Sequence, residues 1–367
     1  MEYSRGIINR NKRSGIKYPL ENFFSADITG FHRSLPGYRP TPVICLNISE
    51  NQVIPGETIL KDESRRTGTG AFKALGGSWA IHQYLAKNPG IHTFCTATDG
   101  NHGRSVAWSS RIMGQKAIVF MPSASARSRI RFIEDEGARV VLVDGDYDQT
   151  VRTAKKYAKD KNCILVQDTS WPGYTDFPNY ISAGYITMVN ELYDQLETGG
   201  LKLPDIFIFQ SGVGSWAAAM MLYITRTHPG PPPTFIISEP LHSDCLMESA
   251  RNNSLCTTLK DQVTIMAGLN CGTPSYSAWE VISDLADAFI SIPDEYSIEA
   301  MRILDACEPA IETCESGAAG LGTLLALFHD RSLKKISEIL QIKKSTSFMI
   351  FNTEGNTDPS GKLMYGI

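Results

Sequence analysis

The sequence predicts an α/β fold made of two doubly wound units whose sheets are mainly parallel. Short apolar runs alternate with helix-type segments from residue 93 to residue 167, and the alternation resumes after residue 205. Neighbouring runs are not joined by hairpin turn signals, which favours parallel over antiparallel pairing. Glycine and aspartate gather at the carboxyl ends of these runs, where parallel sheets bind ligands.

The chain has 367 residues, which exceeds the usual size of a single hydrophobic core. We expect a smaller α/β domain over residues 79–178, inserted into a larger domain formed by residues 1–78 and 179–367. Hydrophobic residues make up 42% and charged residues 20% of the chain, an ordinary balance for a globular protein. Disorder is therefore expected only at the ends.

Charge and hydropathy exclude several classes of protein. The net charge is −4, and the one basic cluster lies near the start of the chain, so we expect no nucleic-acid partner. We expect this cluster to form a solvated arm; it comprises Arg5, Arg10, Lys12, Arg13 and Lys17. No run reaches the roughly 18 apolar residues of a membrane span, and the first residues lack a signal-type run. These features predict a cytoplasmic protein without a membrane partner.

The cysteines are dispersed through the chain. They form no CxxC pair and lack the Cys/His spacing that is typical of zinc sites. We therefore expect no metal and mostly buried thiols.

The first elements lead to a lysine at the start of a helix. Residues 31–42 contain three prolines and a glycine, which predicts an extended, turn-rich segment. Short strands are expected over residues 43–46 and 57–60. A helix should follow over residues 71–85.

The remaining elements repeat a strand-to-helix pattern. The expected strands are 93–97, 116–121, 138–143, 163–167, 205–209, 234–238 and 347–351. The expected helices lie at about 106–113, 126–136, 149–159, 180–195 and 216–225.

Lys73 opens the first of these helices in a glycine-rich setting. Gly68 and Gly70 precede it and Gly76-Gly77 follow it, so backbone can pass close to a flat ligand. A lysine that is partly desolvated has a lowered amine pKa and can form a Schiff base. A surface lysine on a first helical turn is the alternative, and the rest of the chain has to distinguish the two.

A second motif is Thr98-Asp99-Gly100-Asn101-His102-Gly103-Arg104, between a strand and a helix. Exposed amides at such a helix start bind a carboxylate or a phosphate. Asp99 could accept a proton and Asn101 could donate and accept hydrogen bonds. An Asx-type turn that caps the helix is the structural alternative.

A third motif, Gly212-Val213-Gly214-Ser215, also joins a strand to a helix. Its amides and the Ser215 hydroxyl suit a phosphate. The same loop satisfies a dinucleotide fingerprint that continues to Ala217, with Glu239 placed to bind a ribose. On this loop alone the two interpretations are equal, and a plain tight turn is a third.

Three further segments contain candidate residues. Asp168 follows a strand in a loop with two aromatic residues, where it is either a catalytic carboxylate or the cap of a turn. Residues 266–272 and 314–320 are rich in small residues, which let backbone approach a ligand or let helices pack closely. Glu315, in the latter segment, could reach the polar edge of a ligand.

Taken together, these segments resemble the pyridoxal-phosphate enzymes of the tryptophan-synthase-β type (fold type II), and within them the 2,3-diaminopropionate ammonia-lyases. The matching segments are 31–42, 61–64, 71–78, 98–104, 167–169, 212–214, 266–269, 315–318 and 353–355. Asp99 before Gly100-Asn101 is the discriminating residue, because relatives that dehydrate serine or threonine usually lack it.

The resemblance implies pyridoxal 5'-phosphate bound between the two domains. Lys73 would hold it as a Schiff base, and Asn101 would bond its ring hydroxyl. Thr353, or else Asn352, would meet the pyridine nitrogen, and a neutral partner there suits elimination. The other implied cofactor residues are Phe72, Gly212, Val213, Gly214, Ser215 and Glu315. The implied substrate residues are Thr98, Asp99, Gly100, His102 and Gly103.

The implied reaction is α,β-elimination of 2,3-diaminopropionate to pyruvate and ammonia, by a homodimer. We expect Lys73 to deprotonate the L-isomer and Asp99 the D-isomer, with Asp168 assisting at the β-amine. The alternatives are a serine or threonine dehydratase of the same fold, an NAD-dependent oxidoreductase, and a catalytically silent binder of the cofactor.

Overall fold

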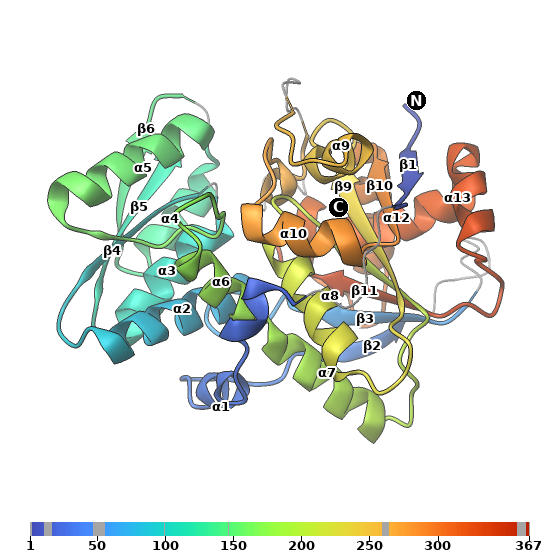
Figure 1. The fold of residues 1–367 in the computed structure, drawn as a ribbon, viewed down its shortest axis with the longest axis horizontal. Coiled ribbons are helices and arrows are strands. Elements are labelled where there is room, and N and C mark those ends of the chain that lie inside the picture. The colour runs from blue at the N-terminus through green and yellow to red at the C-terminus, as the bar shows by residue number, and fades with distance from the viewer. Residues whose placement is uncertain are drawn as a thin grey trace.

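The computed structural model describes residues 2–10, 17–46, 56–98, 100–145, 147–258, 264–357 and 365–366. It contains a four-stranded and a seven-stranded sheet, which lie in two lobes side by side (Figure 1). The predicted α/β class with mainly parallel sheets is confirmed. The predicted domain boundaries at residues 79 and 178 stay a prediction.

The smaller sheet has the order β6-β5-β4-β7 and is parallel throughout. Its strands are β4 (Thr93–Ala97), β5 (Lys116–Pro122), β6 (Arg139–Val143) and β7 (Ile164–Leu165). Helices α3 (Asn101–Ile112), α4 (Arg127–Glu134) and α5 (Tyr147–Lys161) cover it. On β5, Val119 packs with α3 and α4 whereas Phe120 packs with α5, because successive side chains point to opposite faces. Both faces of the sheet are therefore covered, as a doubly wound unit requires.

The larger sheet has the order β1-β10-β9-β8-β11-β3-β2. Its five central strands are parallel, and its two edge strands, β1 (Arg5–Ile8) and β2 (Val43–Leu46), pair antiparallel. The central strands are β3 (Thr58–Asp62), β8 (Ile206–Gln210), β9 (Thr234–Pro240), β10 (Ala288–Ile292) and β11 (Phe348–Asn352).

The remaining helices surround this sheet and join it to the smaller lobe. They are α1 (Asp27–Arg33), α2 (Lys73–Lys87), α6 (Asp176–Gly184), α7 (Ile186–Thr198), α8 (Ser215–Thr227), α9 (Cys245–Asn252), α10 (Tyr276–Leu285), α11 (Asp294–Asp305), α12 (Glu315–His329) and α13 (Lys334–Ile339), with short 3-10 helices at Pro19–Phe23, Ala267–Leu269 and Arg331–Leu333. None of the described helices is long and apolar enough to cross a membrane.

Strand β8 shows why the central strands read as continuous apolar runs. Phe207 and Phe209 pack in one hydrophobic cluster with α8, while Ile206 and Ile208 pack in a second cluster with α12. All of these side chains are buried. A strand that is buried on both faces has no polar alternation.

Two glycines that follow Lys73 serve helix packing. A Cβ on Gly76 would lie 2.7 Å from the carbonyl oxygen of Ile181 in α6, and a Cβ on Gly77 would collide with the Ser105 hydroxyl of α3. The expectation that these glycines bring backbone close to a ligand is therefore wrong. They let α2 lie tightly between two other helices.

Several predicted elements need correction. Residues 31–42 were expected to be extended, yet their first residues belong to helix α1. The helix expected over 180–195 is two helices, which meet between Gly184 and Ile186. The expected solvated arm is wrong for Arg5, which lies in β1 and donates to the Leu241 carbonyl oxygen at 2.7 Å. Residues 12 and 13 of that cluster lie outside the described residues.

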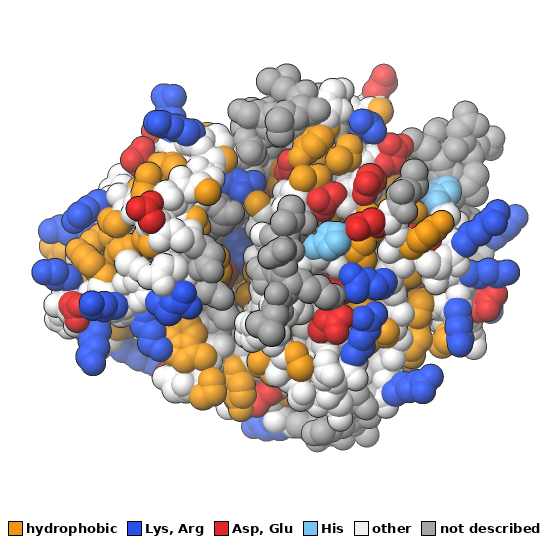
Figure 2. Space-filling model, turned by 90° about the horizontal axis from the view of Figure 1, so that it is seen from above, with side chains coloured by type: hydrophobic (Ala, Val, Ile, Leu, Met, Phe, Trp, Pro, Cys, Tyr) orange, Lys and Arg blue, Asp and Glu red, His pale blue; other side chains and the backbone are white. Residues whose placement is uncertain are grey.

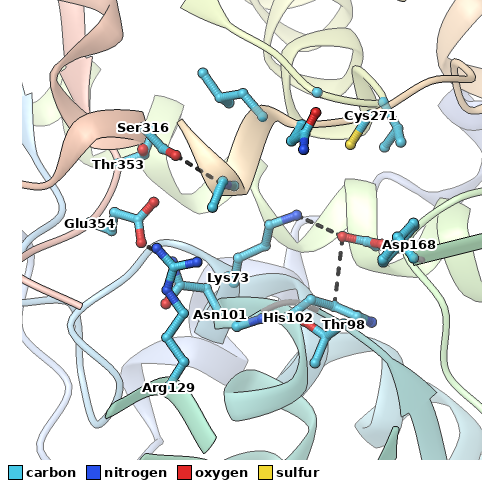
Figure 3. Close-up of a pocket in the computed structure, with 18 of the residues that line it drawn as sticks. Lys73, Thr98, Asn101, His102, Arg129, Asp168, Cys271, Ser316, Thr353 and Glu354 are labelled. Carbon is cyan, nitrogen blue, oxygen red and sulfur yellow. Dashed lines mark hydrogen bonds and ion pairs between the residues drawn. The ribbon is translucent and has the colours of Figure 1, made fainter. Parts of the chain in front are cut away.

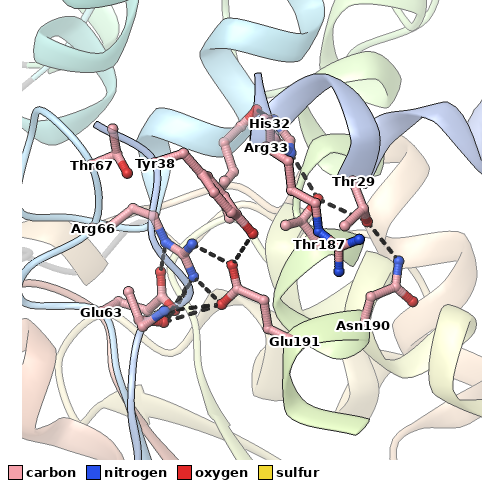
Figure 4. A network of polar contacts seen from close by, with 12 residues as sticks. Thr29, His32, Arg33, Tyr38, Glu63, Arg66, Thr67, Thr187, Asn190 and Glu191 are labelled. Atoms are coloured by element: carbon pink, nitrogen blue, oxygen red, sulfur yellow. Dashed lines mark hydrogen bonds and ion pairs between the residues drawn. The ribbon is translucent and has the colours of Figure 1, made fainter. Parts of the chain in front are cut away.

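A buried charge network joins the loop after β3 to helix α7 (Figure 4). Arg66 donates to Glu63 and to Glu191, each at 2.6 Å, and the Lys61 ammonium donates to Glu191 at 2.8 Å. Burial raises the pKa of Glu191, but hydrogen bonds and charges from Arg66 and Lys61 outweigh it and lower that pKa to about 2. The network fixes the start of the segment that leads to Lys73.

Candidate active site

A cavity of about 800 Å³ opens at the boundary of the two lobes, where Figure 2 shows a hollow. The start of α2, residues 98 and 100–102, and helix α4 line one side of it. Loops at residues 210–216, 267–272 and 353–354 line the other. The predicted motifs thus meet in one place, as expected of the carboxyl ends of parallel strands.

Lys73 is the first residue of α2, and its ammonium donates to the Asp168 carboxylate at 2.6 Å (Figure 3). Burial lowers the pKa of the Lys73 amine, but the charge of Asp168 outweighs burial and raises that pKa above its ordinary value. The predicted lowering of the pKa is therefore wrong for the chain alone. To react with a carbonyl group, Lys73 has to give up a proton.

Asp168 is also the residue that both Lys73 and His102 approach. Burial raises its pKa, yet the proximity of His102 and the charge and hydrogen bond of Lys73 lower it to about 2. The carboxylate is therefore ionised at neutral pH. Asp168 lines the same cavity as Lys73 and His102.

Four described candidates line the cavity just before and at the start of α3, namely Thr98, Gly100, Asn101 and His102. The Thr98 hydroxyl accepts a hydrogen bond from the Gly100 amide at 2.9 Å, and α3 begins at Asn101. Gly103 has a packing role, because a Cβ there would collide with the Thr98 methyl group. Asp99 lies outside the described residues.

Asn101 meets a carboxylate from the opposite lobe. Its side-chain amide donates to Glu354, which follows β11 (Figure 3). Arg129 reaches from α4 into the same part of the cavity. Sequence reasoning assigned no role to Glu354 or to Arg129. Arg129 carries no sequence signal, because it is one of three alternating arginines on a polar helix.

The glycine loop at residues 212–215 lines the cavity in full. Gly214 has φ +91° and caps α8, so the first amides of the helix lack partners inside it. Gly212 admits a close neighbour, because a Cβ there would lie 2.8 Å from the Cys271 sulfur. The Ser215 hydroxyl donates to the Asp168 carbonyl oxygen at 2.8 Å, which leaves its oxygen as an acceptor and the helix amides as the anion receptor.

The dinucleotide interpretation of this loop fails at Glu239. Both of its carboxylate oxygens accept backbone amides of α9, from Leu246 at 2.7 Å and from Met247 at 2.8 Å. The side chain is fully buried, and burial raises its pKa well above the ordinary value. Glu239 caps a helix and is not placed to bind a ribose.

Of the two residues expected at the pyridine nitrogen, Thr353 and Asn352, Thr353 lines the cavity. The neighbouring Asn352 is buried and donates to Asp62 at 2.7 Å and to the Glu312 carbonyl oxygen at 2.8 Å. Glu315 lies buried in the first turn of α12, whereas Ser316 lines the cavity and accepts from the Gly268 amide at 3.0 Å. Cavity residues without a role assigned from the sequence also include Tyr147, Gln210, Trp216, Asn270 and Cys271.

This set of groups fits pyridoxal phosphate. The helix amides at residues 212–215 suit its phosphate, and the Lys73 amine suits its aldehyde. Phe72 lines the cavity and packs against Tyr185 and Trp216, which makes an apolar wall beside the lysine. Thr353 offers a neutral hydroxyl for the pyridine nitrogen.

Comparisons with known proteins agree with this fit. Residues 34–342 match the family model described as pyridoxal-phosphate dependent enzyme. Diaminopropionate ammonia-lyase of Salmonella typhimurium is 38% identical over 361 residues, which cover 91% of this chain and 89% of that protein.

Two crystal structures of diaminopropionate ammonia lyase from Escherichia coli also match. The holo form has a TM-score of 0.91 at 34% identity and covers 99% of this chain and 96% of that chain. The complex with an aminoacrylate-PLP azomethine reaction intermediate has a TM-score of 0.90, with the same identity and coverage.

Proposed function

Because the chain belongs to the pyridoxal-phosphate-dependent enzymes, we propose that it converts D- and L-2,3-diaminopropionate to pyruvate and ammonia by α,β-elimination. The relatives named above are called diaminopropionate ammonia-lyases, which supports the substrate and the loss of ammonia. The observation that carries the proposal is the Asp168 carboxylate at 2.6 Å from the Lys73 amine, in a cavity shared with the loop before α3.

Each cofactor contact is assigned to a residue of the cavity. Lys73 holds the cofactor covalently, the amides at residues 212–215 bind its phosphate, and Asn101 and Thr353 bond its ring. When bound, pyridoxal phosphate supplies an electron sink for the pair released at the α-carbon. Glu315 and Asn352, which we expected at the cofactor, precede Ser316 and Thr353 in the chain, and it is these two that line the cavity.

Two residues share the proton transfer, and a third holds the leaving group. Lys73 removes the α-proton of the L-isomer, and Asp99 removes that of the D-isomer from the other face. Asp168 holds the β-amino group as it leaves. A carboxylate with a pKa of about 2 is ionised throughout the neutral range and therefore attracts an ammonium group.

The runner-up is a serine or threonine dehydratase of the same fold, which would act on a β-hydroxyl. An anionic Asp168 beside Lys73 favours the amine over the hydroxyl as leaving group. We also propose that the protein is a homodimer that works in the cytoplasm.

The test is pyruvate release by the purified holoenzyme, with D- and L-2,3-diaminopropionate and D- and L-serine supplied separately. We expect clear preference for the diamino acid in both configurations. Lys73→Ala should abolish turnover and the borohydride-stable cofactor adduct on the peptide that contains residue 73. Activity on L-serine or L-threonine alone would assign the protein to the dehydratases.

A further inference from the structure

His102 lines the cavity and uses only one of its two ring nitrogens in a hydrogen bond between described residues. His102 Nε2 lies 2.8 Å from the Val166 carbonyl oxygen, which can only accept, so this nitrogen carries the proton. His102 is buried, with 5% of its surface exposed. Its Nδ1 has no hydrogen-bond partner within the part of the chain that the structure describes. Burial lowers the pKa of His102, so Nδ1 presents a lone pair.

A second acceptor lies next to this nitrogen. Asp168 Oδ2 is 3.8 Å from His102 Nδ1, which is too far for a direct hydrogen bond. His102 Nδ1 and the Asp168 carboxylate are thus two neighbouring acceptors, and both residues line the cavity. The Lys73 ammonium donates to Asp168 and leaves His102 Nδ1 without a donor among the described residues. A nitrogen that donates to both at about 2.8–3.0 Å fits between them.

We propose that His102 Nδ1 and the Asp168 carboxylate form an ammonium subsite that receives the β-amino group of the substrate and makes the enzyme select a β-amine over a β-hydroxyl. The inference rests on the proposed function, because it assigns the β-substituent of that substrate. It adds a specificity-determining role for His102 Nδ1, which accepts a hydrogen bond from the substrate together with Asp168. His102 accepts no proton in the reaction.

The selection follows from counting donors. An ammonium group has three hydrogens and can satisfy both acceptors, whereas a hydroxyl has one and leaves the other acceptor buried and unpaired. A site built to bond a donor rejects an analogue that lacks it far more strongly than an apolar pocket rejects a methylene. The ammonium also needs no further proton, because the carbon–nitrogen bond breaks with its electron pair on nitrogen and neutral ammonia leaves.

The test uses two ligands that bind without turnover because they have no α-proton, namely α-methyl-2,3-diaminopropionate and α-methylserine. Their dissociation constants are measured by calorimetry on the holoenzyme. In His102→Gln the side-chain amide can still donate to Val166, but the acceptor at Nδ1 is lost. We expect the constant of the diamino ligand to rise on the order of tenfold and that of the hydroxy ligand to change less than about twofold.

The matched control is His329→Gln, at an exposed histidine that ends α12; both constants should stay unchanged. Equal weakening of both ligands by His102→Gln, or no weakening, would overturn the subsite. Asp168→Asn gives the second measurement if His102→Gln does not fold, and it should also weaken the diamino ligand more than the hydroxy ligand.

Turnover by the wild-type holoenzyme separates the two proposals. If it turns over 2,3-diaminopropionate while His102→Gln keeps the same ratio of kcat/KM for the diamino acid and serine, only the subsite is wrong. If the wild type turns over serine alone, the proposed function fails, and the subsite fails with it.

Discussion

The Lys73 ammonium lies 2.6 Å from the Asp168 carboxylate, although the two residues are 95 positions apart in the chain. Lys73 begins α2, and Asp168 follows the short strand β7 of the smaller sheet. Burial alone would favour the neutral amine of Lys73, and the negative charge of Asp168 keeps this amine protonated. The protonation of the central lysine is thus controlled from a distant segment.

Removing that charge should change the titration of Lys73. In Asp168→Asn the carboxylate that raises the pKa of the Lys73 amine is gone and burial remains, so this pKa should fall below the ordinary 10.5. Competitive labelling of the cofactor-free protein across pH, read by mass spectrometry at Lys73, should show half-maximal reaction at a pH lower by at least about one unit. An unchanged midpoint in Asp168→Asn would contradict the assigned cause.

Asp99→Asn should separate the two isomers of the substrate. The substitution keeps the size of the side chain but removes the base, which typically costs about 10²-fold or more. We expect that loss in kcat for D-2,3-diaminopropionate and less than about a threefold change for the L-isomer, measured as pyruvate release. Equal losses on both isomers would show that the two bases do not divide the work.

The buried network around Glu191 should dominate a stability measurement. Glu191→Gln leaves Arg66 and Lys61 without their shared anion, which should cost about 3–5 kcal/mol of unfolding free energy in urea. Glu197→Gln, at an exposed site on the same helix, should change it by less than about 0.5 kcal/mol.

The same network predicts a pH dependence. The pKa of Glu191 is lowered from 4.5 to about 2, so its stabilisation is fully present above pH 4.5 and is lost as the pH falls towards 2. The difference between the wild type and Glu191→Gln should therefore shrink below pH 4.5. A difference that stays constant down to pH 3 would argue against an ionised Glu191.

A pair of glycine substitutions tests helix packing beside the lysine. Gly77→Ala should cost about 1–3 kcal/mol, because the new methyl group collides with Ser105, which donates to the Lys73 carbonyl oxygen at 2.6 Å. Gly30→Ala, within α1 and with no described atom within 4 Å of the new methyl group, should stabilise by about 0.4–1 kcal/mol. Urea unfolding of the two variants should give shifts of opposite sign.

Much of the fold could be predicted from the sequence because parallel strands are buried on both faces. The expected strands 43–46 and 93–97 coincide with β2 and β4 to the residue. The start of α3 was placed five residues too late, because Gly100 and Asn101 read as loop residues. Strand β10 and the helices around it were not predicted, since their apolar pattern carries no glycine loop that marks a strand end.

The residues of the candidate site could be predicted only where they belong to a recognisable sequence motif. Lys73, Asp168 and the glycine loop belong to such motifs, and the structure places them on one cavity. Glu354 and Arg129 could not be found, since their roles depend on which lobe they face. The pKa of Lys73 was predicted with the wrong sign, because desolvation can be argued from local sequence whereas the charge of Asp168 comes from tertiary proximity.

The phosphate role of the glycine loop can be separated from backbone strain. Gly214 has φ +91°, and a Cβ there would lie 2.6 Å from the Ile282 side chain, so Gly214→Ala must displace the first amides of α8. Gly200 has φ +65° and no described atom within 4 Å of a Cβ, so Gly200→Ala carries similar strain at a distance from the cavity. Both variants should lose about 1–2 kcal/mol of stability.

Only Gly214→Ala should lose cofactor affinity, because only its displaced amides meet the phosphate. We expect its dissociation constant for pyridoxal phosphate, titrated by the absorbance of the Lys73 adduct, to rise on the order of tenfold or more, since an amide bond to an anion is a charge-assisted hydrogen bond. Its constant for pyridoxal, which has no phosphate, should match that of the wild type. If pyridoxal were weakened as much as pyridoxal phosphate, the loop would support the lysine and not the phosphate.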